Sequence, residues 1–222
     1  MSTIQFNKIR AIAFDFDGVI LDSVSLKADL FIASYPFPLS EQEKSAILAY
    51  QAAHGGVGRV KKFEHFERSI FGREPDSKAI AALAKRYSNL LMDQIAFCAE
   101  LPGARNFLRR FERTLSLHLV SGTSHDDLLK IVGDRDMADF FQTITGSPTG
   151  KVEAFTAIAR ATGYAFEQIL AIGDSTTEFA AACEVGMPFV GIVEAGAENP
   201  FPAKTPVYND LATFGAVWPL AD

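Results

Sequence analysis

The stretch Ala11–Ser23, AIAFDFDGVILDS, decides how this chain folds, because it joins an apolar strand directly to a pair of carboxylates. Its first residues, AIAF, form the short apolar run that is typical of a strand inside a parallel sheet. Asp15 and Asp17 follow at once, two residues apart, and precede Gly18. Two like charges at this spacing repel each other, so the sequence predicts a positive partner for them elsewhere in the chain.

The overall composition limits the classes of function. The chain has 222 residues, of which 48% are hydrophobic, and it can therefore bury a sizeable core. Its formal net charge of −6 argues against broad binding to nucleic acid or acidic membranes, because their phosphates attract basic surfaces. No apolar stretch approaches the roughly 20 residues that cross a bilayer, and the N-terminal MSTIQFNKIR lacks the apolar segment of a signal peptide.

Cysteine usage points in the same direction. Cys98 and Cys183 are the only cysteines, and both stand in helical patterns without a CxxC motif. They are interpreted as buried free thiols of a reducing compartment. We therefore expect a cytoplasmic protein that binds neither nucleic acid nor a membrane and has no evident protein partner.

The pattern of strands and helices predicts an α/β fold with a parallel sheet. Short apolar or β-branched runs recur along the chain, and helical patterns separate the later ones; these runs are RAIAFDF, LSLHLVS, QILAIGD, PFVGIV and PVYND. After the first strand, residues 24–99 carry helical periodicity only, where a crossover needs about a dozen residues. We therefore predict a core of residues 1–23 and 100–222, with residues 24–99 as an inserted helical domain.

The insert has helix signals of its own. Ser40 followed by Glu43 is a capping-box signature, and HGGVG at 54–58 interrupts the helical pattern that follows it. A further helix is predicted from apolar residues on one face of SKAIAALAKRYSNLLMDQIAF, namely Ile80, Leu83, Tyr87, Leu90, Leu91 and Ile95.

Four polar clusters follow predicted strands or open the next helix, where open parallel sheets bind their ligands. They contain Asp15 and Asp17; Ser121 in VSGTS; Lys151 in SPTGKVEAF; and Asp174 and Glu178 in GDSTTEF. Purely structural interpretations also exist, since Ser124 with Asp127 and Ser175 with Glu178 fit helix-capping pairs. Lys151 is harder to explain in this way, because a cation in the first helical turn opposes the helix dipole unless an anion lies nearby.

A divalent cation explains the clusters together. Mg²⁺ would neutralise Asp15 and Asp17, and Asp174 would complete a site that keeps positions open for water and a phosphate oxygen. Lys151 and Ser121 would hold the phosphate from the other side. A carboxylate shielded in this way can attack phosphorus and form an aspartyl phosphate.

The ordered motifs DFDGV, VSGTS, GK and GDSTTE resemble those of the haloacid dehalogenase-like hydrolase superfamily, over about Ala11–Pro188. The resemblance implies a Rossmann-like core with an inserted all-helical cap, and a C1-capped phosphatase or β-phosphoglucomutase-like enzyme. It also implies a role for each motif residue: Asp15 is the nucleophile, Asp17 the acid and base and a metal ligand through its backbone carbonyl, Ser121, Gly122 and Lys151 bind phosphate, and Asp174 binds the metal. Glu178 stands where the family usually has Asp, as a metal residue of the outer shell.

The presence of Asp17 implies phosphate-ester chemistry, because the dehalogenases that resemble this chain lack a carboxylate there. The expected function is a Mg²⁺-dependent phosphatase that acts on a small phosphorylated metabolite, either a sugar phosphate or a phosphoglycolate-like acid. Two alternatives stand beside it: a sugar phosphomutase of the β-phosphoglucomutase type, and a non-catalytic interaction module.

The insert offers candidates for substrate recognition. The glycine-rich turn in AHGGVGRVKKFEHF is expected to reach over the site, with Arg59 and Lys62 beside it as readers of the far end of the substrate. The competing interpretation is that these cations are solvated.

Overall fold

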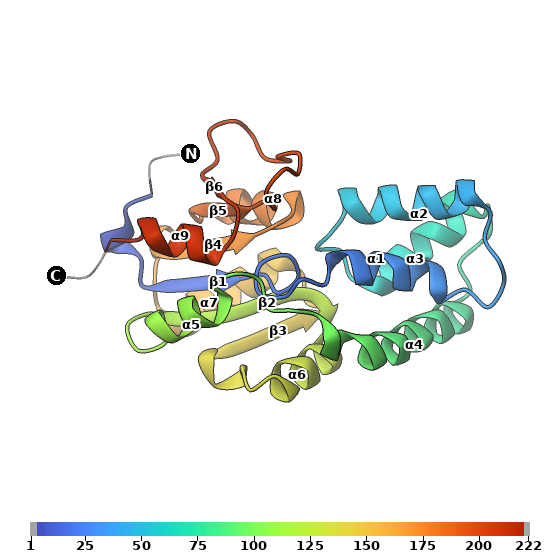
Figure 1. Cartoon of the computed structure of the whole chain (residues 1–222), viewed down its shortest axis with the longest axis horizontal. Helices are drawn as coiled ribbons and strands as arrows, with labels where there is room; N and C mark the ends of the chain where they lie inside the picture. The colour runs from blue at the N-terminus through green and yellow to red at the C-terminus, as the bar shows by residue number, and fades with distance from the viewer. Residues whose placement is uncertain (1–3, 220–222) are drawn as a thin grey trace.

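The computed structural model describes residues 4–219, so the ends of the predicted core at 1–3 and 220–222 lie outside the described residues. The described chain forms a sheet with its helices and, beside it, a group of four helices from residues 24–94 (Figure 1). This arrangement confirms the predicted α/β core with an inserted helical cap.

The sheet has six parallel strands in the order β3-β2-β1-β4-β5-β6. The strands are β1 (Ala11–Phe14), β2 (Ser116–Ser124), β3 (Thr143–Ser147), β4 (Ile169–Gly173), β5 (Phe189–Ile192) and β6 (Val207–Tyr208). Five of the six were predicted from the sequence. The prediction missed β3, a half-buried edge strand whose sequence TITGS is too polar to form an apolar run.

Helices cover both faces of the sheet. Alternate residues of β1 point to opposite faces: Ile12 and Phe14 join one apolar cluster, and Ala11 and Ala13 join the other. The first cluster includes α5 (Ala104–Phe111), α6 (His125–Asp134) and α9 (Leu211–Val217); the second includes α7 (Lys151–Thr162) and α8 (Thr176–Val185). This double coverage explains why β1 reads as a continuous apolar run.

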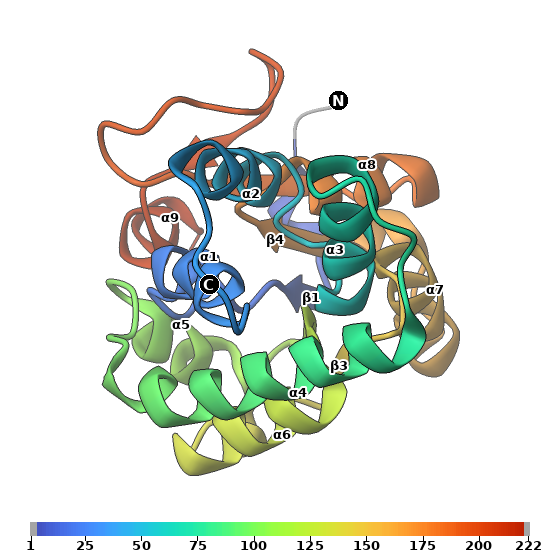
Figure 2. The ribbon, with the colours of Figure 1, turned by 90° about the vertical axis from the view of Figure 1, so that its right-hand side faces the viewer.

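The cap contains α1 (Val24–Ala33), α2 (Glu41–Ala53), α3 (Arg59–His65) and α4 (Ser77–Gln94), grouped in front of the sheet in Figure 2. The capping box of Ser40 and Glu43 opens α2 as predicted. Short helical turns complete the described chain: η1 (Phe6–Lys8), η2 (Phe66–Ile70), η3 (Ile95–Phe97), η4 (Ala138–Phe140) and η5 (Phe166–Gln168). Aromatic rings fill the centre of the cap, with Phe31 packed edge-on against Phe63 and Phe66.

The two connections between cap and core run side by side. The Asp22 amide donates to the Ala99 carbonyl at 3.0 Å, and the Leu101 amide donates to the Ile20 carbonyl at 2.9 Å. The cap therefore leaves and rejoins the core at one place. The domain limits of residues 23/24 and 99/100 are consistent with this pairing and stay our proposal.

Two further expectations concern the surface. Within residues 4–219, no helix has the length and apolar character that a membrane crossing requires. Both cysteines are free, as predicted, but the prediction that both are buried is wrong: Cys98 is partly buried and Cys183 is exposed, because it lies on the solvent side of α8.

Candidate active site

The polar clusters meet at the carboxyl end of the sheet. Asp15 and Asp17 follow β1, Ser121 lies near the end of β2, and Asp174 follows β4. Because β1 connects through the cap to β2 on one side and pairs with β4 on the other, the strand order reverses at β1. A crevice opens at such a reversal in parallel sheets, and the four clusters surround it.

Lys151 is the positive partner that Asp15 requires. Its Nζ lies 3.0 Å from Oδ1 of Asp15 and 2.9 Å from Oε1 of Glu178, and it donates to the Val120 carbonyl at 2.6 Å. Lys151, Asp15 and Glu178 are all buried. A buried ion pair keeps its charge only when its partners are this close, so Lys151 is fixed beside Asp15.

The titration behaviour of the pair follows from burial and charge. Burial raises the pKa of Asp15 to about 7; Lys151 opposes this rise, and the carboxylates of Glu178 and Asp17 add to it. Burial also opposes the positive charge on Lys151, but Asp15 and Glu178 outweigh it and raise the lysine pKa. The charged form of Asp15 therefore depends on compensating positive charge.

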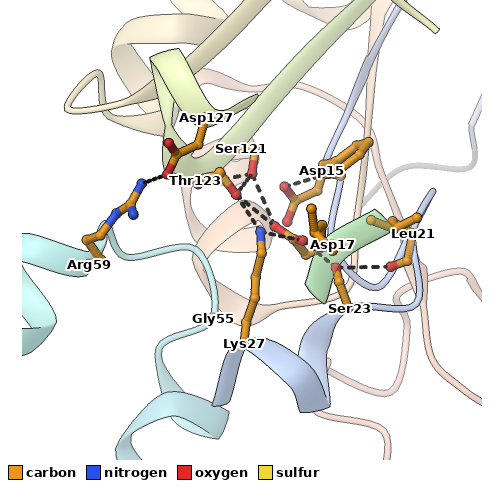
Figure 3. A network of polar contacts seen from close by, with 12 residues as sticks. Asp15, Asp17, Leu21, Ser23, Lys27, Gly55, Arg59, Ser121, Thr123 and Asp127 are labelled. Atoms are coloured by element: carbon orange, nitrogen blue, oxygen red, sulfur yellow. Dashed lines mark hydrogen bonds and ion pairs between the residues drawn. The ribbon is translucent and has the colours of Figure 1, made fainter. Parts of the chain in front are cut away.

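Asp17 faces a different set of partners (Figure 3). Its Oδ1 lies 2.6 Å from Nζ of Lys27 and accepts from Oγ of Ser23 at 2.5 Å. Its Oδ2 accepts from the hydroxyls of Thr123 at 3.2 Å and Ser121 at 3.3 Å. Burial opposes ionisation of Asp17, but Lys27 and these hydrogen bonds outweigh it and hold the pKa of Asp17 below its usual range.

A group of acids fits a metal ion. Asp15, Asp174 and Glu178 each offer one carboxylate oxygen, and these oxygens lie within 4.8 Å of one another. Burial and the neighbouring carboxylates raise the pKa of Asp174 well above its usual value, so the cluster lacks positive charge. Gly18 keeps the place open, since its φ of +74° favours glycine and a Cβ there would overlap the Asp174 carboxylate. Oxygen ligands of this kind suit Mg²⁺.

Each oxygen of the Glu178 carboxylate has its own partner. One oxygen pairs with Lys151, and the other accepts from the Ser175 hydroxyl. The side chain therefore holds Lys151 in place as well as adding charge near Asp174. Its role as an outer-shell metal residue stays a prediction.

The glycine-rich turn of the cap lies directly on the core. A Cβ on Gly122 would lie 2.8 Å from the Gly56 carbonyl oxygen, and one on Gly55 would lie 3.0 Å from Cβ of Ser175. Real Cβ atoms essentially never come as close as 2.8 Å to another atom, and 3.0 Å is tighter than most of their contacts. Glycine at 122, the predicted phosphate-binding residue, therefore lets the turn seat directly against the core, as the sequence pattern indicated.

A cavity of about 190 Å³ lies between cap and core, and Asp15, Asp17 and Asp174 line its floor. Lys62 lines its cap side, where its Nζ donates to Gln51 and, at 3.2 Å, to the Gly55 carbonyl. Burial lowers the pKa of Lys62 to about 7, and the nearby charge of Lys27 adds to this effect. Both hydrogen-bond partners of Lys62 are neutral, and among the described residues no carboxylate lies within ion-pair distance of its ammonium.

Arg59 is buried and forms a contact between cap and core. Its guanidinium donates to Asp127 of the core (Figure 3). It also donates to Ser124 of the core and, at 2.5 Å, to Ser88 of α4. It also lies over the ring of Tyr87. The predicted solvated alternative is wrong for this side chain, because Arg59 is 8% exposed. Its contact with substrate stays a prediction.

We expect Arg59→Ala to lower kcat/KM by roughly tenfold or more, because it leaves the partly buried Asp127 without its cation and weakens cap closure. Asp127→Asn removes the same ion pair from the other side and should give a similar loss, measured on the same substrate. If instead Asp127→Asn stays near wild type while Arg59→Ala fails only on substrates with an anionic leaving group, Arg59 reads the substrate.

The sequence interpretation missed Lys27. A signal was present, because Lys27 stands three and four residues before Leu30 and Phe31 and so shares the buried face of α1. The pairing of Asp127 with Arg59 had no such signal, since 68 residues separate them. From the sequence, Asp127 was predicted only to cap a helix together with Ser124.

Comparisons with known proteins agree with this geometry. Residues 9–186 match the family model of haloacid dehalogenase-like hydrolases. The phosphoglycolate phosphatase of Salmonella choleraesuis is 24% identical over 85% of this chain and 82% of its own. Among solved structures, a hydrolase from Pseudomonas syringae superposes with a TM-score of 0.76 at 17% identity, covering 94% of this chain and 97% of its own. CbbY from Rhodobacter sphaeroides, in complex with phosphate, has a TM-score of 0.73 at 18% identity and covers 93% and 96%. The chain belongs to the family of haloacid dehalogenase-like hydrolases.

Proposed function

We propose that this protein is a Mg²⁺-dependent phosphatase that hydrolyses a small phosphorylated metabolite with an anionic leaving group, of the phosphoglycolate type. The observation that carries the proposal is that Asp15 and Asp174 lie on the floor of a cavity whose cap side presents Lys62, while Lys151 pairs with Asp15. The relatives named phosphoglycolate phosphatase support the same substrate class.

Asp15 is the proposed nucleophile. An oxygen of its carboxylate forms a bond to phosphorus while the bond from phosphorus to the leaving oxygen breaks, which gives an aspartyl phosphate and an alkoxide. Lys151, at 3.0 Å from Asp15, reduces the repulsion between the carboxylate and the incoming phosphate. Ser121 and the Gly122 amide are the proposed partners of the phosphate oxygens on the opposite side.

Asp17 is the proposed acid and base. It gives a proton to the leaving alkoxide in the first half of the reaction and takes one from the attacking water in the second. The water oxygen then bonds to phosphorus, phosphate leaves, and the Asp15 carboxylate is restored. The hydrogen bonds from Ser23 and Thr123 fix the orientation in which Asp17 does this.

Asp15, Asp174 and the backbone carbonyl of Asp17 are the residues that would hold Mg²⁺. When bound, the ion offsets the negative charge that the phosphate and the carboxylates bring together. The residues fit such an ion, since Asp15, Asp17, Asp174 and Glu178 face only Lys27 and Lys151 at ion-pair distance among the described residues.

The size and charge of the cavity support a small acid as substrate. At about 190 Å³ it is below the roughly 300–1,000 Å³ that drug-sized ligands occupy. Lys62 lies inside it without a carboxylate partner, so an anionic group on the leaving part of the substrate would complete its interactions. A two- or three-carbon phosphorylated acid has both the size and the charge.

Release of inorganic phosphate tests the proposal. With Mg²⁺ present, we expect phosphoglycolate and similar short acids to be hydrolysed with the highest kcat/KM in a panel that also holds sugar phosphates and nucleotides. Conversion of β-glucose 1-phosphate to glucose 6-phosphate, with a bisphosphate activator, would contradict the proposal and show that the protein is a sugar phosphomutase. If no ester is turned over, the remaining alternative is a non-catalytic interaction module.

The lowered pKa of Lys62 predicts a pH dependence of KM. An anionic substrate binds the protonated ammonium, so KM for phosphoglycolate should rise as the pH increases through about 7, where free Lys62 loses its proton. Lys62→Arg keeps its charge and should flatten this rise, measured by initial rates from pH 6 to 9. The idea fails if Lys62→Gln shows the same rise as the wild type.

A further inference from the structure

We propose that Lys27 is a positioning residue which carries the closure of the cap to Asp17, by fixing the orientation of the Asp17 carboxylate only while the cap is closed. This inference rests on the proposed function, in which Asp17 transfers protons. It adds a cap residue to chemistry that the core motifs alone would otherwise perform.

The first observation is where the contact lies. Lys27 belongs to α1 of the cap, whereas Asp17 and Thr123 belong to the core. The Lys27 ammonium lies 2.6 Å from Oδ1 of Asp17 and donates to the Thr123 hydroxyl at 2.6 Å. The ion pair therefore crosses the boundary between the two parts at the reacting centre (Figure 3).

The second observation is how completely Asp17 is held. Its Oδ1 has Ser23 and Lys27 as partners, and its Oδ2 has Ser121 and Thr123. The three hydroxyls belong to residues of the predicted core, as Asp17 does, whereas the ammonium comes from the cap. Lys27 is the charged partner within 4.0 Å of Asp17 in the described chain, and its displacement removes the strongest interaction that orients the carboxylate.

The third observation is that Lys27 is buried at this contact. Its residue is 7% exposed, and its α1 neighbours Leu30 and Phe31 are buried with it. Burying an ammonium is costly unless a close anion compensates. Asp17 is that anion, so closure of the cap and formation of the pair stabilise each other.

The two halves of the reaction give a test that a structural role would not pass. p-Nitrophenolate leaves without needing a proton, whereas hydrolysis of the aspartyl phosphate needs Asp17 as base. In Lys27→Met, formation of the aspartyl phosphate from p-nitrophenyl phosphate should therefore stay within about threefold of wild type, and its hydrolysis should slow by roughly tenfold to a hundredfold. Rapid-mixing experiments should show a burst of p-nitrophenolate of about one per active site.

Two variants keep the result interpretable. Lys27→Arg retains the charge and should recover much of the hydrolysis step. Lys85→Met removes an exposed cap lysine of α4 and should behave as wild type. Thermal unfolding checks that each variant is folded, and Lys27→Gln replaces Lys27→Met if the latter is not.

Equal losses in both steps, or no loss in either, would overturn the role of Lys27. The same holds if Lys27→Arg recovers nothing while it is folded. Failure of the proposed function looks different, because the wild type itself would then release no phosphate from any ester in Mg²⁺.

Discussion

Replacing Asp15 by asparagine is expected to lower kcat by roughly 10³-fold or more while leaving the protein folded. The amide oxygen is a poor nucleophile toward phosphorus, so no aspartyl phosphate forms. Lys151 retains Glu178 as a partner at 2.9 Å, and the cluster loses one of its repelling charges, so the melting temperature should not fall. Phosphate release and thermal unfolding, measured on the same preparation, check both parts.

The matched control is Asp22→Asn, which removes a carboxylate from the same segment at an exposed position after β1. It should keep near wild-type rates. Trapping the phosphorylated enzyme in acid and mapping the modified peptide should find phosphate on Asp15 of the wild type. Phosphate on any other residue, or substantial activity of the asparagine variant with its mass confirmed, would contradict the assignment.

Removing divalent cations is expected to abolish activity, and Mg²⁺ should restore it. Asp174→Ala should raise the Mg²⁺ concentration needed for half-maximal rate by tenfold or more, because one of the clustered carboxylates is lost. Ca²⁺ should inhibit, since its larger and looser coordination misplaces the reacting groups. Undiminished activity in EDTA would contradict the whole site.

Metal binding also has a readout that does not depend on turnover. A ligand that binds only the folded state stabilises it by about 2.7 kcal/mol at a hundred times its Kd, so Mg²⁺ should raise the melting temperature of the wild type more than that of Asp174→Ala. Cations bind the ionised carboxylates. Because the pKa of Asp15 is about 7 and that of Asp174 is raised, Mg²⁺ affinity should fall as the pH drops from 8 to 6.

Local sequence patterns were sufficient for the fold class. Buried strands such as β1 and β4 are continuous apolar runs, and a run of this kind has few alternatives in a chain with helices between its strands. The edge strand β3 escaped prediction because its half-buried residues need not be apolar. Its pairing with β2, and not its own composition, makes it a strand.

The residues of the site also differ in whether local sequence patterns could predict them. Lys151 stood out because a cation in the first helical turn opposes the helix dipole. Asp15 and Asp174 stood out because each follows a predicted strand at the edge of the sheet where ligands bind. Lys27 did not, since a lysine on a helix is ordinarily solvated, and only the packing of α1 against the core brings it to Asp17. Contacts between cap and core depend on how two bodies meet, which no local pattern contains.

The paired connections between cap and core have a consequence for how such an enzyme can change over evolutionary time. Because the chain leaves and re-enters the core at hydrogen-bonded neighbours, residues 24–99 can be altered or exchanged without disturbing the strand order that gathers Asp15 and Asp174. The aromatic centre of the cap gives it packing of its own. If Lys62 sets the substrate preference as we propose, that preference can drift independently of the phosphate chemistry, and the proposed contact of Lys27 with Asp17 would tie the two together.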